Sequence, residues 1–224
     1  MSKPRIVLLS LEKRAHFDKM YTHLLTALKA KADVEMIEKP SEARQAFGCG
    51  TKAKPQAILV TDGALLASTR MSLVQEAASY ARDGGTLVFM GDFASSARSS
   101  DIETLFDTLG LPWASGDYHR TTSNVNRNAL HLQNVASNDA VYLPSGAPTQ
   151  SIVFESRAVD TTQSPTVYGA TGGGKVGYIG DANAEDEVYA CRTPYVRSLT
   201  LGLATIVESS DAIDVWNAQG IEQS

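Results

Sequence analysis

The sequence predicts an α/β fold with a mostly parallel central sheet and an antiparallel extension in its C-terminal half. In the first half, short apolar runs alternate with amphipathic segments in the order strand, helix, strand, helix. This order calls for parallel strands joined by right-handed crossovers. From Leu111 to about Tyr168, short β-leaning pieces stand among Asn, Ser, Pro and Gly, with no convincing helix, which favours antiparallel strands.

The central strand is expected between two turn signals. Gly84 and Gly85 end the preceding element, an apolar run to Met90 follows, and Gly91 then leads abruptly to Asp92. A continuous apolar run of this length is typical of a strand that is buried on both faces. Because ligands of open α/β sheets bind beyond the carboxyl ends of the strands, Asp92 is the first candidate for an acid, a base or a nucleophile. A turn-capping role is the alternative.

The other elements follow from hydrophobic spacing and from turn residues. In the first half we expect strands at residues 6–10, 33–37 and 57–63, an amphipathic helix within 11–31, a brief helix after Pro40, and helices at about 71–82 and 99–109. In the second half we expect strands near 117–122, 130–132, 141–143 and 151–154, a hairpin of 166–168 with 175–180, and a last helix from Pro194 to about Val207. Glycines at 84 and 110 are expected to end the two long helices before them.

Composition limits the class of protein. The chain has 224 residues, 43% of them hydrophobic and 20% charged, which suits one large domain over residues 1–210 with a polar tail at 211–224. The net charge is −5 and the basic residues are scattered, so no nucleic-acid partner is expected. The two cysteines, Cys49 and Cys191, are too few for a disulfide framework and fit a reducing compartment.

No membrane partner is expected either. No apolar window approaches the roughly 20 residues that a membrane span requires. The apolar run that follows the basic N-terminus is too short for a signal peptide. The sequence therefore predicts a cytoplasmic protein.

Two further groups of residues are site candidates. Glu12, Asp62 and Asp181 each follow a predicted strand, so we expect them to line the rim of the same sheet edge as Asp92. The segment 115–122 gathers a carboxylate, a phenol, an imidazole and a guanidinium, which could orient and protonate a small polar ligand. The alternative for this segment is a polar strand edge whose arginine pairs with an acid. The binding candidates around these two regions are Glu12, Asp62, Phe93, Trp113, Tyr118, Arg120 and Asp181, and the catalytic candidates are Asp92 and His119.

Several catalytic motifs are absent or incomplete. The run from Gly169 to Val176 nearly spells a phosphate-binding P-loop, but Val176 lacks the hydroxyl that binds magnesium, and a strand follows instead of a helix. A hairpin turn is the preferred interpretation. The sequence holds no G-x-S-x-G elbow and no C-x-x-C pair, and its four histidines lack close metal-ligand spacing. We predict no cofactor and no metal.

The elbow at Gly91, the closing hairpin of 174–181 and the helix of 195–207 together resemble the class I glutamine amidotransferase-like superfamily, and more closely its ThuA-like branch. Residues 116–122 are similar to a Gly-x-Tyr-His-Arg-Thr-Thr segment of uncharacterised fungal proteins of this fold. The resemblance implies a flavodoxin-like three-layer sandwich, often a homodimer. Amidotransferases and DJ-1-like members place a cysteine at the elbow, where this chain has Asp92, so the resemblance does not extend to glutaminase or thiol chemistry.

Two functional hypotheses follow. The first is an enzyme, a hydrolase or a lyase, that acts on a small polar or carbonyl-bearing molecule by hydrolysis, hydration or elimination. Asp92 and His119 would share proton transfer, and Arg120 would bind an anionic group. The second is a non-catalytic ligand-binding or assembly protein that retains the fold, which the missing nucleophile favours.

Overall fold

A computed structural model describes residues 3–49, 53–121, 127–133, 140–142, 149–152, 155–158, 162–164 and 166–180. Asp181, the helix expected at 194–207 and the polar tail at 211–224 lie outside these ranges. From Asp117 to Ala158 the backbone of the strands is described, but their side chains are not.

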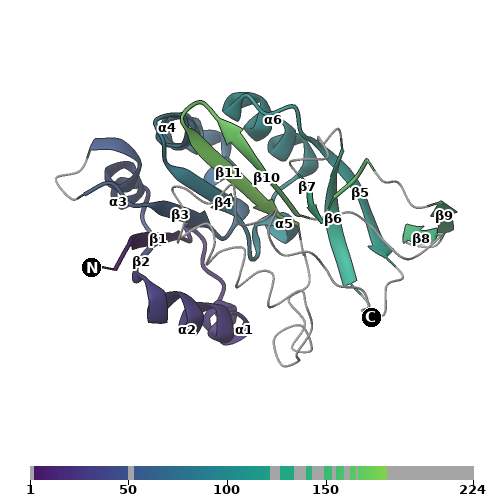
Figure 1. Cartoon of the computed structure of the whole chain (residues 1–224), viewed down its shortest axis with the longest axis horizontal. Helices are drawn as coiled ribbons and strands as arrows, with labels where there is room; N and C mark the ends of the chain where they lie inside the picture. The colour runs from purple at the N-terminus through teal and green to yellow at the C-terminus, as the bar shows by residue number, and fades with distance from the viewer. Residues whose placement is uncertain are drawn as a thin grey trace, which may run out of the picture.

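A mixed sheet forms the centre of the molecule (Figure 1). Within the described ranges it has seven strands in the order β2-β1-β3-β4-β11-β10-β7. Their bounds are β1 Arg5–Leu9, β2 Asp33–Ile37, β3 Ala57–Val60, β4 Thr86–Phe89, β7 Ala140–Tyr142, β10 Thr166–Thr171 and β11 Gly174–Ile179. The five strands from β2 to β11 are parallel, and β10 is antiparallel to both of its neighbours. The parallel part has the flavodoxin-like order 2-1-3-4-5, with β11 as its fifth strand.

Helices cover both faces of this sheet. Figure 1 shows α1 and α2 on one side and α4 and α6 on the other. The helices are α1 Phe17–Met20, α2 Thr22–Lys31, α3 Pro40–Arg44, α4 Met71–Arg82, α5 Phe93–Ser96 and α6 Ser99–Leu109. A π-helical turn at Gln45–Cys49 and 3-10 turns at Gly63–Leu66 and Ser68–Arg70 complete the helical segments that the structure describes. None of these helices is long and apolar enough to span a membrane.

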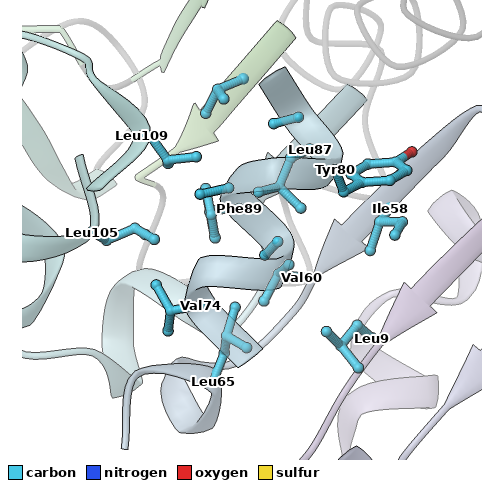
Figure 2. Packing of buried hydrophobic residues seen from close by; sticks show 14 of the residues in the cluster. Leu9, Ile58, Val60, Leu65, Val74, Tyr80, Leu87, Phe89, Leu105 and Leu109 are labelled. Atoms are coloured by element: carbon cyan, nitrogen blue, oxygen red, sulfur yellow. The ribbon is translucent and has the colours of Figure 1, made fainter. Parts of the chain in front are cut away.

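The inner parallel strands β1, β3 and β4 are buried on both faces, as their continuous apolar runs predict, whereas the edge strand β2 is only partly buried. Successive side chains of β1 alternate between two core clusters, with Val7 and Leu9 in one and Ile6 and Leu8 in the other. Figure 2 shows the larger cluster, in which Val60 and Phe89 from the sheet pack with Val74 of α4 and with other residues of the helical layer. The three-layer α/β fold with a mostly parallel sheet is thereby confirmed.

The helix expected within residues 11–31 is shorter than predicted. Residues 11–16 form a loop, and the helical part is divided into α1 and α2 at Tyr21. The backbone N–H of Glu12 donates to the carboxylate of Asp62 at 3.1 Å. A partner fifty residues away in the sequence therefore ties this loop to the end of β3.

The glycine signals at the ends of the long helices are confirmed. Gly84 follows α4 with φ of 91° and Gly110 follows α6 with φ of 72°, both in the left-handed region that favours glycine. The P-loop-like run is a hairpin turn between β10 and β11 that packs on the end of α4, since the Gly173 N–H donates to the Arg82 carbonyl at 2.7 Å. A Cβ atom at Gly174 would overlap the Ala81 carbonyl oxygen. Close packing of this turn against the end of α4 explains why glycines stand at 173 and 174.

A second sheet of the order β6-β5-β8-β9 follows α6 and supplies the antiparallel extension. Its strands are β5 Ala114–Thr121, β6 Arg127–Gln133, β8 Thr149–Ile152 and β9 Glu155–Ala158. Strand β5 is longer than the 117–122 segment expected from the sequence, because it begins directly after Trp113.

Candidate functional site at the carboxyl edge of the parallel sheet

The carboxyl ends of β1, β3 and β4 lie side by side at one edge of the sheet. They are followed by Ser10, by Thr61 and Asp62, and by Gly91 and Asp92. Strand β2 lies on one side of β1 and strand β3 on the other, so the connections leaving β1 and β2 run in opposite directions across the sheet. The strand order therefore switches between β1 and β3. This reversal is the point where open α/β sheets leave room for a ligand.

Asp62 holds the loops of this edge together. One carboxylate oxygen accepts from the Ser10 hydroxyl and from the Glu12 N–H, both at 3.1 Å, and the other accepts from the Ala64 N–H at 3.0 Å. The last of these bonds caps the 3-10 turn Gly63–Leu66. Because three donors already engage it, the Asp62 carboxylate positions the site and leaves little capacity for a ligand.

Asp92 sits in a sharp turn between β4 and α5. Gly91 has φ of 67°, in the left-handed region, and Asp92 itself has φ of −74° and ψ of 0°. Its carbonyl accepts from the Ser95 and Ser96 hydroxyls at 3.0 and 2.6 Å, and the Ser96 hydroxyl also accepts from the Gly63 N–H at 2.8 Å. The turn is thus fixed to the 3-10 turn that follows β3, which gives the Asp92 side chain a defined position.

The Asp92 carboxyl is buried, with 7% of its side chain exposed, and has three neighbours from the N-terminal segment. Arg14 Nε lies 3.9 Å from Asp92 Oδ2, the Tyr21 hydroxyl hydrogen-bonds to the carboxyl, and His16 acts on it through its charge. Burial raises the pKa of Asp92, and the nearby Asp62 raises it further, whereas Arg14, His16 and Tyr21 lower it. Desolvation is the largest of these effects, so the net shift is upward.

Glu12 lies at the exposed rim of this edge, and its contact with a ligand stays a prediction. Arg70 donates to Glu12 Oε1 at 3.4 Å and to the Ala64 carbonyl at 2.6 Å, which links the loop after β1 to the 3-10 turn after β3. The Glu12 side chain is 69% exposed. Its carboxylate therefore faces solvent.

Two apolar candidates pack in the core. Phe93 is completely buried against Phe89, with ring centroids 4.8 Å apart. Trp113 is 3% exposed and packs edge-on against Phe106 at 5.3 Å. In this structure both rings fill space in the larger core cluster and present almost no surface to a ligand.

The remaining candidates come from the second half of the chain. Tyr118, His119 and Arg120 lie in β5 of the second sheet, where the backbone of His119 pairs with Ala129 and that of Arg120 with Asn128 and Ser151. Their side chains and the whole of Asp181 fall outside the described part of the chain. Their roles stay predictions.

Sequence reasoning missed the three neighbours of Asp92, which are Arg14, His16 and Tyr21. Hydrophobic spacing placed all three within the amphipathic helix expected in 11–31, and none of them was a site candidate. A useful signal was present in the strand order: the loop after the first strand of such a fold faces the switch point. Charged residues directly after that strand are site candidates for this reason.

The site has no evident metal ligands in the described ranges. There, no three or more His, Cys, Asp and Glu side chains lie together so that they could hold a metal ion. The chemistry that the arrangement supports is proton transfer by a buried carboxyl next to cationic groups.

Comparisons with known proteins bear on the fold. No protein-family model and no curated protein matches the sequence. A ThuA-like protein from Bacteroides uniformis ATCC 8492 is similar in structure, with a TM-score of 0.56 and 12% sequence identity over 95% of each chain. This likeness shows that the two chains share an α/β fold.

Two glycosidases contain a similar part. Op5Man5, an exo-β-1,4-mannosidase from Opitutaceae bacterium strain TAV5, has a TM-score of 0.44 and 11% identity over 92% of this chain and 34% of its own. Gan42B, a GH42 β-galactosidase, has a TM-score of 0.44 and 12% identity over 90% of this chain and 30% of its own. The chain spans about a third of the length of these two enzymes.

Proposed function

We propose that this protein is an enzyme that acts on a small polar or carbonyl-bearing molecule by acid/base chemistry at the carboxyl edge of the parallel sheet. The observation that carries the proposal is the Asp92 carboxyl, which is buried beside Arg14, His16 and Tyr21 at the end of the central strand. Carboxyls with perturbed pKa values at a ligand-binding edge are candidates for catalysis. Hydrolysis, hydration and elimination all use such a group.

The turn after β4 supports a mechanism without a covalent cysteine. The residue with the left-handed backbone of a strand-to-helix elbow is Gly91, which has no side chain to act as a nucleophile. Asp92 is the next residue, and because its pKa is raised, its carboxyl keeps a proton to a higher pH than an ordinary aspartate does. Such a group can protonate a carbonyl or leaving group and then remove a proton in a later step.

His119 is the second proposed proton-transfer group, and Arg120 a proposed contact of the substrate. Both belong to β5, the first strand of the second sheet. The proposal for His119 rests on the residue types that β5 gathers, since an imidazole changes charge near neutral pH.

Product formation in a metabolite extract tests this function. The purified chain, Asp92→Asn and His119→Ala are each incubated with the extract, and consumed and formed molecules are followed by mass spectrometry. We expect a substrate and product pair with the unchanged chain and a loss of turnover of about a hundredfold or more in Asp92→Asn, the size of a general acid/base contribution. If Asp92→Asn turns over the substrate at an unchanged rate, the proposed role of Asp92 is wrong. If no extract component is bound or converted by any of the three proteins, the non-catalytic assembly protein becomes the better hypothesis.

A further inference from the structure

Arg14 has an unusual position among the charged residues of the site. Its carbonyl accepts from the Phe17 N–H at 3.0 Å, so Arg14 closes the turn that leads into α1. This turn directs Arg14 toward Asp92, where its Nε lies 3.9 Å from Asp92 Oδ2. That separation is the longest of the ion pairs between described residues and exceeds hydrogen-bond length.

The other charges around Arg14 have closer partners. Lys13 contacts Asp18 at 2.7 Å, and Arg70 contacts Glu12 at 3.4 Å and the Ala64 carbonyl at 2.6 Å. Asp62 accepts from three donors of the protein. Arg14 is 45% exposed, although it stands next to a carboxyl that is only 7% exposed. The acidic partner of the Arg14 guanidinium is thus more distant than that of Lys13 or Arg70.

The geometry points to Arg14 as the anion-binding residue of this site. We propose that the site takes a small carboxylic acid with a carbonyl or hydroxyl group next to its carboxylate, a substrate class that rests on the function proposed above. The planar guanidinium binds a carboxylate through two parallel hydrogen bonds. The neighbouring carbonyl or hydroxyl oxygen would then lie within reach of the Asp92 carboxyl.

The balance of charge favours a singly charged ligand. Arg14 lies beside the Asp92 carboxyl, on which Asp62 also acts as a second acid and His16 as a second positive charge. A phosphate dianion would be repelled by these carboxylates more strongly than a carboxylate would be. Tyr21 and His16 face the same carboxyl as Arg14 and can orient the ligand's second oxygen.

The test is a binding measurement, independent of turnover. Pyruvate, lactate, acetone and inorganic phosphate are titrated against the whole chain, and binding is followed by calorimetry and by the rise of the melting temperature. We expect pyruvate or lactate to bind more tightly than acetone and phosphate. Arg14→Gln is expected to weaken that binding by about tenfold to a hundredfold, since a charge-assisted pair is lost. Arg14→Lys keeps the positive charge but not the pair of parallel hydrogen bonds, so its affinity is expected to lie between those of the unchanged chain and Arg14→Gln.

Arg44→Gln is the matched control. Arg44 is 57% exposed and lies 3.4 Å from Glu76, so it is an arginine that pairs with a different carboxylate, in the helical layer. Its replacement is expected to leave pyruvate binding unchanged. The proposal would be overturned if Arg14→Gln or Arg14→Lys bound pyruvate as tightly as the unchanged chain does. It would also be overturned if the unchanged chain bound phosphate more tightly than pyruvate and lactate. Binding of none of the four probes also overturns it.

These outcomes separate the two proposals. Arg14-dependent binding without any turnover in the metabolite extract would support the anion site and contradict the enzyme. Turnover that depends on Asp92 but not on Arg14 would support the enzyme and contradict the anion site.

Discussion

The Ser10 hydroxyl donates to the Asp62 carboxylate at 3.1 Å, and this bond ties the end of β1 to the end of β3. The same carboxylate accepts from the Glu12 N–H and thereby fixes the start of the loop that carries Arg14 and His16 to the Asp92 carboxyl. One buried side chain thus determines the path of the loop from which the candidate site draws two of its residues.

The first prediction concerns this carboxylate. Asp62→Ala removes a cap and leaves the buried Ser10 hydroxyl and the Glu12 N–H without their acceptor, so we expect a loss of about 2–3 kcal/mol in the free energy of unfolding. Urea denaturation measures it. Asp107→Ala, an exposed position on α6, is the control and should change stability by no more than about 0.5 kcal/mol. Equal stabilities of the two variants would contradict the role assigned to Asp62.

The second prediction concerns the cost of burying Asp92. Its pKa is raised above the ordinary value of 3.8 by burial, so the folded state holds this proton more tightly than the unfolded chain does. The contribution to stability is therefore fully present below the ordinary pKa and is lost as the pH rises through the raised pKa. Asp92→Asn should gain about 0.5–2 kcal/mol of unfolding free energy near neutral pH, the usual gain when an unfavourable functional position is replaced.

Urea denaturation of both proteins over a range of pH checks this prediction. Because the two proteins differ only at residue 92, the difference between their stabilities reports on the Asp92 carboxyl and on the charges coupled to it. We expect this difference to be smaller below pH 3.8 than near neutral pH. A difference that grows as the pH falls would mean that Asp92 is held as a stabilising carboxylate.

The third prediction concerns Tyr21. Its hydroxyl hydrogen-bonds to the Asp92 carboxyl and lowers the pKa of that group, while its ring packs on Phe17 at a centroid distance of 4.7 Å. Tyr21→Phe keeps the ring and should raise the pKa of Asp92 further. Carbon-13 NMR of the aspartate carboxyls measures it directly. Tyr168→Phe is the control, because the Tyr168 hydroxyl bonds to Thr86 and not to Asp92. This change should leave the pKa of Asp92 unchanged.

The fourth prediction tests the glycine run that resembles a P-loop. A Cβ atom at Gly174 would overlap the Ala81 carbonyl and crowd the Gly85 backbone, so Gly174→Ala should cost about 2–3 kcal/mol or more, as overpacking against backbone does. Gly48→Ala is the matched change, because a Cβ there meets nothing within 4 Å and its helical backbone suits alanine. We expect Gly48→Ala to be neutral or stabilising by about 0.5–1 kcal/mol. Thermal unfolding of the pair decides, and a fully stable Gly174→Ala would reopen a ligand-binding role for the run.

Much of the fold was predictable because its signals are local. The apolar run from Thr86 to Met90 is long enough for a strand buried on both faces, and the structure places β4 there. The glycines after α4 and α6 adopt the left-handed backbone that their position at a helix end predicts. Asp92 at the carboxyl end of β4 followed from the general rule for open α/β sheets.

The sequence by itself determined which segments are strands and helices, and it placed acids at one edge of a parallel sheet, because these properties depend on residue spacing within a few turns of chain. The tertiary structure alone decided what surrounds Asp92. Helical spacing within 11–31 is satisfied equally well by a longer helix, whereas in the structure residues 11–16 form a loop whose Glu12 N–H bonds to Asp62 at the end of the neighbouring strand β3. That long-range pairing brings Arg14, His16 and Tyr21 to the Asp92 carboxyl, and burial in their company raises its pKa.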